Sequence, residues 1–355
     1  MLANAYQERS FLVIKQIIIN KVLDEHMKKL SFIIPLYNSA QWLEKCLYSV
    51  LNQDLPESDL EIICINDGSP DNSAELAREI AKEHPSIIVI EQENQGPSGA
   101  RNTGMRRATS KYLCFVDPDD YVEPNVYGGL VKQMEEQQLD MLRFDFQVVN
   151  EHYEIIPKRA FEMQFDYTSQ LMTGTEFLIN RLDIACNIWR YIYRTDIITK
   201  NNIWCYTGDY YDDTPWLPLV LMKAERMNVC DIVVYNYLER SDSLVNAKSP
   251  KAVQRKIDGG IMLLEILYEQ LKIIKDKGVR RWYDTVITLT VISLMTLIGT
   301  HQYDNRDKYL SKIYHLNIFP LPYHNQVQKA KRKLCLLNIS PKLFLWLLNM
   351  KNKKQ

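Results

Sequence analysis

From residue 30 onward, short continuous apolar runs alternate with stretches whose apolar residues recur every three or four positions. The continuous runs are typical of strands buried on both faces, and the recurring spacing is typical of helices that pack one face on a sheet. The predicted strands are 30–36, 60–65, 86–91, 112–116 and 141–149, and the predicted helices lie within 39–51, 73–83 and 125–138. Strands and helices that alternate in this way are joined by crossover connections. We therefore expect an α/β fold with a mostly parallel central sheet.

The chain divides into three parts. Residues 1–29 precede the first strand, and Met27 directly ahead of it reads like a bacterial start. We therefore expect residues 1–26 to be a mis-assigned extension, with an amphipathic helix over 11–23 as the alternative. Residues 30–246 form the α/β domain, and residues 247–355 have the apolar periodicity of a helical C-terminal extension.

Charge is also distributed unevenly. Residues 251–355 hold 19 Lys and Arg against 7 Asp and Glu, which leaves 24 against 37 in residues 1–250, a charge of −13 in front and +12 behind. An acidic body argues against nucleic-acid binding. From Lys329 onward, eight basic residues and no acid are mixed with leucines. This mixture favours an interfacial helix on anionic lipid, with a basic face packed on the domain as the alternative.

The cysteine and hydropathy patterns predict a cytoplasmic protein. Seven scattered cysteines without a C-x-x-C pair match neither a disulfide framework nor a zinc site. The apolar stretch 11–19 is interrupted by Lys15 and lacks a cleavage site, so it is not expected to be a signal peptide. The uncharged run 285–303 contains many hydroxyl residues, which favours a buried helix over a membrane span.

Polar segments follow the first four predicted strands. Ligands of parallel sheets bind beyond the carboxyl ends of the strands, so we expect these segments to form one site. The segments are 35–38, 66–69, 93–102 and 117–120.

Three carboxylates lie within four residues after the fourth strand. Asp117, Asp119 and Asp120 would repel one another unless a cation neutralised them. Their hard oxygen donors suit Mg²⁺ or Mn²⁺, which proteins usually hold with one or two carboxylates plus substrate phosphates. We predict that these residues bind such a metal. A solvated acidic turn, with Asp117 capping the next helix, is the alternative.

The segment 96–104 can bring bare backbone amides close to a ligand because it contains three glycines. Arg101 adds a guanidinium with the geometry to bind a phosphate. Its spacing matches neither a dinucleotide-binding fingerprint nor a P-loop, and a tight loop whose glycines serve only turning is the alternative. Asp67 can accept a hydrogen bond from the imide of a uracil, and Tyr37 can offer a stacking face. For Asp67 an ordinary Asp-Gly turn is the alternative.

In their order along the chain these segments resemble the family 2 glycosyltransferases, which have the GT-A fold. The resemblance runs from residue 30 to about 246 and is carried by SFIIPLYN (31–38), NDGS (66–69), GPSGARN (96–102) and FVDPDD (115–120). It implies a Rossmann-like sheet flanked by helices and a nucleotide-sugar donor, usually UDP-linked. The residues that would hold the donor are Pro35, Tyr37, Asn38, Asp67, Gly96, Ala100, Arg101, Asn102 and Asp117. The same resemblance gives Asp117, Asp119 and Asp120 to the ribose and the metal.

The second half of the resemblance concerns catalysis. Residues 210–216 look like the family's Glu-Asp motif, in which the second acid is the catalytic base. The resemblance therefore implies that Asp213 is the base. Asp212 stands where the family has Glu, which leaves the orientation of this neighbour less certain.

Residues 237–243 resemble the family's tyrosine-arginine-serine stretch, which would place Arg240 against the departing diphosphate. A surface arginine paired with Glu239 or Asp242 is the alternative. Trp189 and Trp216 are possible sugar-stacking residues of an acceptor pocket. Core packing is the preferred interpretation for both.

The resemblance implies an inverting, metal-dependent glycosyltransferase that moves a hexosyl or N-acetylhexosaminyl group from a UDP-sugar to a glycan or lipid-linked hydroxyl in cell-surface polysaccharide synthesis. Two alternatives stay open. A nucleotidyltransferase would use a glycine- and lysine-rich signature near the N-terminus, which this chain lacks. A catalytically inactive sugar-nucleotide-binding or scaffold protein would keep the fold alone. We expect a cytoplasmic protein whose basic C-terminal helices contact the inner membrane surface.

Overall fold

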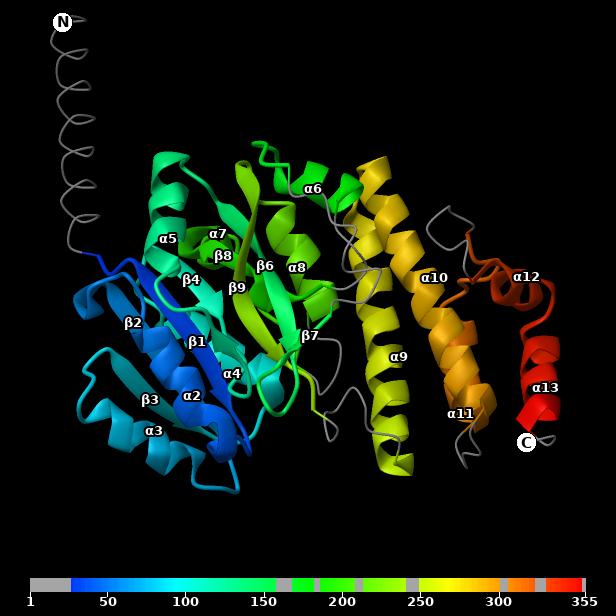
Figure 1. The fold of residues 1–355 in the computed structure, drawn as a ribbon. Coiled ribbons are helices and arrows are strands. Elements are labelled where there is room, and N and C mark those ends of the chain that lie inside the picture. Colours follow the sequence, from blue (N-terminus) through cyan, green and yellow to red (C-terminus); the bar gives the residue numbers. More distant parts are fainter. Residues whose placement is uncertain are drawn as a thin grey trace, which may run out of the picture.

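The computed structural model describes residues 27–157, 168–181, 186–207, 213–240, 249–300, 306–322 and 330–352. One central sheet is flanked by helices, and further helices from the C-terminal part of the chain stand beside it (Figure 1). The predicted N-terminal extension, residues 1–26, lies outside the described residues.

The first half of the sheet is built from strand–helix units. In chain order these are β1 (Leu30–Leu36), α2 (Ala40–Leu51), the short 3-10 turn Glu57–Asp59, β2 (Leu60–Asp67), α3 (Ser73–Ala81), β3 (Ile87–Gln92), α4 (Gly96–Arg107) and β4 (Tyr112–Phe115). The strands pair in parallel in the order β3-β2-β1-β4. Because crossovers are right-handed, this order puts α2 and α3 on one face and α4 on the other. The direction of winding reverses at β1, which is where ligands bind in such sheets.

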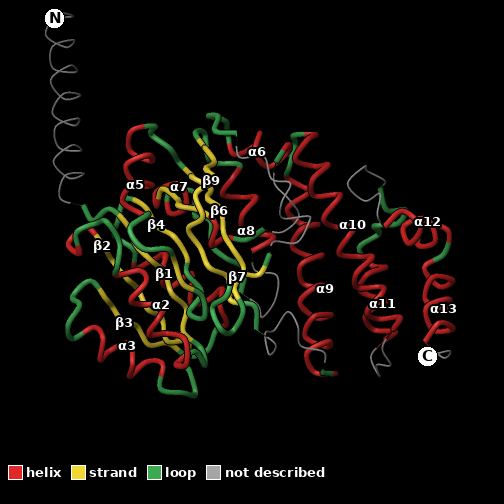
Figure 2. Tube along the Cα trace, in the orientation of Figure 1, coloured by secondary structure: helices red, strands yellow, loops and turns green. Residues whose placement is uncertain are grey.

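The second half of the sheet is mixed. Its elements are β5 (Tyr121–Val122), α5 (Tyr127–Glu136), β6 (Met141–Val149), β7 (Ile155–Ile156), α6 (Gly174–Asn180), the 3-10 turn Ile188–Arg190, β8 (Tyr191–Arg194), α7 (Thr195–Thr199), α8 (Asp213–Leu221) and β9 (Met227–Leu238). The sheet continues β4-β8-β6-β9-β5, with β8 antiparallel to both neighbours and β6 parallel to β9. In Figure 2 the yellow strands form a central layer with red helices around it. The α/β fold class is as predicted, and the antiparallel strands were not evident from the apolar pattern.

Two local predictions need correction. The glycine-rich segment is not a loop, because all of 96–104 lies in α4. Gly104 instead allows close packing, since an added Cβ would lie 2.4 Å from Ile33 Cγ2 and 3.0 Å from Ile65 Cδ1. The helix expected from Asn125 begins at Tyr127, because Asn125 has a left-handed φ of 56°.

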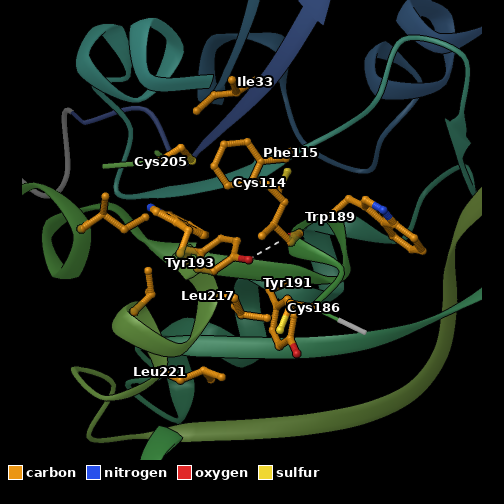
Figure 3. Packing of buried hydrophobic residues seen from close by; sticks show 14 of the residues in the cluster. Ile33, Cys114, Phe115, Cys186, Trp189, Tyr191, Tyr193, Cys205, Leu217 and Leu221 are labelled. Carbon is orange, nitrogen blue, oxygen red and sulfur yellow. Dashed lines mark hydrogen bonds between the residues drawn. The ribbon is translucent and has the colours of Figure 1, made fainter. Parts of the chain in front are cut away.

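Aromatic side chains fill the core beneath the second half of the sheet (Figure 3). Trp216 is fully buried and makes edge contacts with Phe115 and Tyr193, at centroid distances of 5.6 and 5.4 Å. Trp189 is 5% exposed and stacks on Tyr235 at 4.2 Å. Both tryptophans therefore pack in the core, the preferred interpretation, and Trp216 offers no face to a sugar.

The C-terminal part forms α9 (Pro250–Ile273), α10 (Lys277–Thr300), α11 (Arg306–His315), α12 (Lys331–Ile339) and α13 (Pro341–Asn352). Helix α9 packs on α8, and α10 packs on α6 and α9. Helix α10 is long and apolar enough to cross a membrane by length and composition, but 61% of its most apolar window is buried inside the structure. Core helices pass the same test, and this burial agrees with the buried helix expected there.

Candidate functional site

Arg101 connects the first and second halves of the site. It projects from α4 and is only 6% exposed. Its Nη2 donates to Asp117 Oδ1 at 2.8 Å, and its Nη1 lies 3.9 Å from Asp213 Oδ1. One buried cation thus brings together the carboxylate after β4 and the carboxylate that begins α8. These are the residues that the sequence assigned to the donor and to catalysis.

Arg240, just beyond β9, forms a second ion pair at the same edge. Its Nη2 lies 3.0 Å from Asp119 Oδ2, and its guanidinium stacks 4.1 Å from the centroid of the Trp42 ring. The side chain of Arg240 is 18% exposed, so the surface-arginine alternative does not describe it. Of the partners considered from the sequence, Asp242 lies outside the described residues.

Asp120 is buried and anchored by the protein itself. Tyr235 Oη donates to its Oδ2 at 2.7 Å, and the Leu238 amide donates to its Oδ1 at 2.7 Å. Burial, followed by the nearby charges of Asp119 and Asp117, raises the pKa of Asp120 well above its ordinary value. Tyr235 Oη also accepts a hydrogen bond from the Asp117 amide at 3.0 Å. The Tyr235 hydroxyl therefore fixes the acidic loop at two points.

The three carboxylates of this loop do not form a ready-made metal cage. Asp117, Asp119 and Asp120 each have a different protein partner, and the described part of the chain contains no group of three His, Cys, Asp or Glu arranged to hold a metal. A magnesium-type ion needs only one or two carboxylates when substrate phosphates complete its shell. Asp119, a quarter exposed, fits that smaller role best because both Asp120 oxygens already accept hydrogen bonds.

The loops after β1 and β2 are joined through Asp71. Its Oδ2 accepts from the Ala40 amide at 2.9 Å, and its Oδ1 accepts from Ser69 Oγ at 2.6 Å, while Ser69 Oγ accepts from the Asn38 amide at 2.7 Å. No side chain from its own N-cap residue, Ser39, caps α2. Burial disfavours the ionised carboxylate, but hydrogen bonds from serine hydroxyls and backbone amides outweigh it and lower the pKa of Asp71 from 3.8 to about 2.

Asp67 ends β2 and is 3% exposed. Its Oδ1 accepts from Gln92 Nε2 at 2.6 Å and from the Gln95 amide at 2.8 Å, which ties β2 to the start of α4. Gly68 follows with a φ of 66°, as the turn alternative required. Oδ2 accepts no hydrogen bond from a described residue, so a uracil contact through this oxygen stays a prediction.

Other predicted donor residues differ in what they expose. Tyr37 is 54% exposed, as a stacking face requires, whereas Pro35 is buried within β1. Ala100 is fully buried. Gly96 begins α4 with a φ of 77°, and the first amides of a helix have no partner within it. Any contact from this helix start to a donor would therefore come from backbone, with the partial positive charge of a helix N-terminus.

Asn102 has a clear structural role. Its Nδ2 donates to the Cys205 carbonyl at 2.9 Å, and its Oδ1 accepts from the Cys205 amide at 2.8 Å. These two bonds hold the segment before α8 against α4. A nucleotide contact of Asn102 stays a prediction and would have to replace one of these bonds.

The base motif is described only in part. Asp213 begins α8, its side chain is a quarter exposed, and its Oδ2 accepts from the Ile188 amide at 3.4 Å. Asp212 lies outside the described residues.

Sequence reasoning assigned no role to Tyr235 or Asp71. Asp71 had a signal, since it follows the NDGS segment (66–69) by two residues, whereas Tyr235 is one of 21 tyrosines without a distinctive spacing.

Comparison with known proteins finds glycosyltransferases similar to this chain. Residues 31–187 match the family model described as Glycosyl transferase family 2. The Bacillus subtilis protein named uncharacterized glycosyltransferase EpsJ is 35% identical over 216 residues. That match covers 60% of this chain and 62% of EpsJ, so the chain spans less than two thirds of this relative.

Solved structures show the same fold. Staphylococcus aureus TarS 1–349 in complex with UDP-GlcNAc has a TM-score of 0.65 at 19% identity, over 91% of this chain and 89% of that one. The Pyrobaculum calidifontis mannosyltransferase PcManGT in complex with GDP-Man and Mn²⁺ has a TM-score of 0.52 at 14% identity, over 92% of this chain and 87% of that one. The predicted GT-A fold is confirmed.

The hydrogen bonds to the Asp71 carboxylate predict that the stability of the fold falls at acid pH. Because the pKa of Asp71 falls from 3.8 to about 2 on folding, its ionised form stabilises the fold above about pH 4 and loses this effect as the pH falls toward 2. We expect the free energy of unfolding of wild type to exceed that of Asp71→Asn by about 1 kcal/mol at neutral pH, after allowance for solvent screening. Urea unfolding at a series of pH values measures the difference. If the difference in unfolding free energy stayed constant down to pH 2, the ionised Asp71 carboxylate would not be the stabilising group.

The double anchor at Tyr235 predicts a cost of losing one hydroxyl. In Tyr235→Phe the Asp117 amide and Asp120 Oδ2 each lose their partner, so we expect a loss of about 1–3 kcal/mol in the free energy of unfolding. Tyr237→Phe is the matched control, because the Tyr237 hydroxyl bonds to no described residue although its ring also stacks on Trp189. Urea denaturation should separate the two variants, and equal losses would show that ring packing rather than the hydroxyl matters.

Proposed function

We propose, from the membership of residues 31–187 in glycosyl transferase family 2, that this chain transfers a sugar from a nucleotide-linked donor to an acceptor hydroxyl. The observation that carries the proposal is the buried guanidinium of Arg101, which lies between Asp117 on the donor side and Asp213 on the catalytic side. The donor that the neighbouring TarS structure supports is a UDP-sugar.

On this proposal the donor lies along the carboxyl ends of β1, β2 and β4. The nucleobase of the donor would stack near the exposed ring of Tyr37 and form a hydrogen bond with Asp67. The ribose would contact Asp117. The diphosphate would lie toward the start of α4 and toward Arg240. Both supply positive charge where negative charge grows as the bond to the sugar breaks.

We propose Asp119 as the carboxylate that meets a divalent cation, Mg²⁺ or Mn²⁺. When bound, such a cation neutralises diphosphate charge in the transition state. The Mn²⁺ in the PcManGT complex supports a divalent cation, and the partial exposure of the Asp119 side chain supports the choice of this carboxylate. Asp120 would keep the loop in shape, because Tyr235 and the Leu238 amide occupy its oxygens. Asp117, which is paired with Arg101, would contact the ribose.

Transfer is proposed to proceed with inversion. The acceptor hydroxyl oxygen attacks the anomeric carbon while the bond from that carbon to the diphosphate oxygen breaks, and the electron pair leaves with the diphosphate. Asp213 takes the proton of the attacking hydroxyl. Arg101 and the Ile188 amide orient the Asp213 carboxylate. The acceptor class we propose is a glycan or lipid-linked hydroxyl in polysaccharide synthesis, at the cytoplasmic side of the membrane.

Replacement of the base tests the catalytic assignment. Asp213→Asn should keep UDP-sugar affinity within a few fold and lower the transfer rate by a factor on the order of 100 to 10,000, the usual contribution of a positioned base. Calorimetric titration and UDP release with acceptor measure the two effects. Glu135→Gln, an exposed acid on α5, is the control and should change neither. Near wild-type transfer by Asp213→Asn would place the base elsewhere, with Asp212 the next residue to test.

Replacement of the metal carboxylate should give the opposite pattern. In Asp119→Ala the cation loses its carboxylate, so we expect the Mn²⁺-dependent gain in UDP affinity to disappear. Affinity without metal should be kept or rise, because Asp119 no longer competes with the diphosphate for Arg240. Titrations of UDP with Mn²⁺ and with a chelator measure this gain in both proteins. If the gain persists in Asp119→Ala, the cation is held by other residues.

A further inference from the structure

Helix α13 is apolar on two sides. One side packs inward, where Phe344 and Leu345 are 3% and 4% exposed. The approach to α10 is close, because a Cβ added to Gly299 would lie 2.7 Å from Leu348 Cδ1. This packing fixes the orientation of α13 and therefore the direction of its other side.

The other side forms an exposed apolar stripe. Leu343, Trp346, Leu347 and Met350 follow the spacing i, i+3, i+4, i+7 and are 39%, 55%, 39% and 43% exposed. Ile339, at the end of α12, is 74% exposed. Single exposed apolar residues are ordinary, but a contiguous stripe on one helix marks a contact surface.

Basic side chains lie on the same two helices. Lys331, Arg332 and Lys333 in α12 and Lys342 in α13 are exposed. No Asp or Glu follows Asp307 anywhere in the sequence. In Figure 1 the two helices lie at the outer end of the helical layer, on the side away from the sheet, so the body does not stand between them and a flat surface.

We propose that the α12–α13 stripe, residues 339, 343, 346, 347 and 350, binds the surface of an anionic lipid bilayer. An amphipathic helix of this kind inserts its apolar side at the boundary of headgroups and acyl chains, and lysines add attraction to anionic headgroups. Tryptophan favours that boundary. A second copy joined face to face through the same stripe would bring its lysines against these, so like charges oppose that occupant. The proposal does not depend on the proposed transfer activity.

Flotation of the full-length protein with vesicles tests it. We expect binding to vesicles of two parts phosphatidylcholine and one part phosphatidylglycerol and much weaker binding to phosphatidylcholine alone. Leu343→Gln/Trp346→Gln/Leu347→Gln should lose binding. Lys331→Gln/Lys333→Gln/Lys342→Gln should weaken it by about fivefold for each cation removed, since a basic residue near an anionic surface contributes roughly 1 kcal/mol. Ile155→Gln/Ile232→Gln/Ile273→Gln removes exposed apolar residues elsewhere and should bind like wild type.

Three further measurements test whether the variants are folded, whether Trp346 enters the bilayer and whether the stripe joins copies of the chain. UDP affinity should be the same in all three triple variants, since none touches the site. Quenching of fluorescence by brominated phosphatidylcholine in the anionic vesicles should be seen in wild type and largely lost in Trp346→Phe. Vesicle binding by the apolar variant at the wild-type level would overturn the proposal. So would light scattering that shows a wild-type oligomer dispersed by the same variant, because the stripe would then be an interface between copies.

Discussion

The buried contact of Arg101 with Asp117 and Asp213 is the interaction on which the arrangement of the site depends. A guanidinium that is only 6% exposed loses most of its hydration, so its charge must be compensated by fixed carboxylates. Those carboxylates come from the end of β4 and the start of α8, and the arginine comes from α4. The ion pair can form only when three separate elements meet. The close packing of α4 on β1 and β2 at Gly104 therefore positions Arg101 as well as stabilising the fold.

A second constraint is the density of acid at this edge of the sheet. Three carboxylates in residues 117–120 would repel one another, and the protein answers with a different partner for each: Arg101, Arg240, and Tyr235 with the Leu238 amide. Contacts within the protein therefore hold each carboxylate of the loop in place, which is the kind of preorganisation that electrostatic catalysis requires. Asp119 is the one whose partner, Arg240, is also proposed to meet the diphosphate. Donor binding and the Arg240–Asp119 pair are consequently linked, because one guanidinium cannot serve both at full strength.

The sequence predicted the first half of the fold well because its signals are local. Continuous apolar runs mark β1 to β4, and polar residues at their ends converge by topology alone. The apolar pattern did not predict that 96–104 is helical, and the reason for Gly104 is a contact with Ile33 and Ile65, which are distant in sequence. The hydroxyl of Tyr235 and the amide of Asn102 have the same difficulty, since each acts through a partner about a hundred residues away. The resemblance pointed to Asp213 as the base, which stays a prediction, and only the structure places Arg101 beside it.

The division of charge along the chain gains meaning from the position of α12 and α13. Basic and apolar composition alone fits a helix packed on the domain as well as a helix on lipid, and α13 does the first with one side and leaves the second side exposed. A body of charge −13 is repelled by an anionic surface that attracts an extension of +12. Repulsion of the body and attraction of the extension favour the same orientation, with the C-terminal helices toward the anionic surface. A bilayer would then meet the chain at its outer helices, on the side away from the sheet whose edge carries the acidic site.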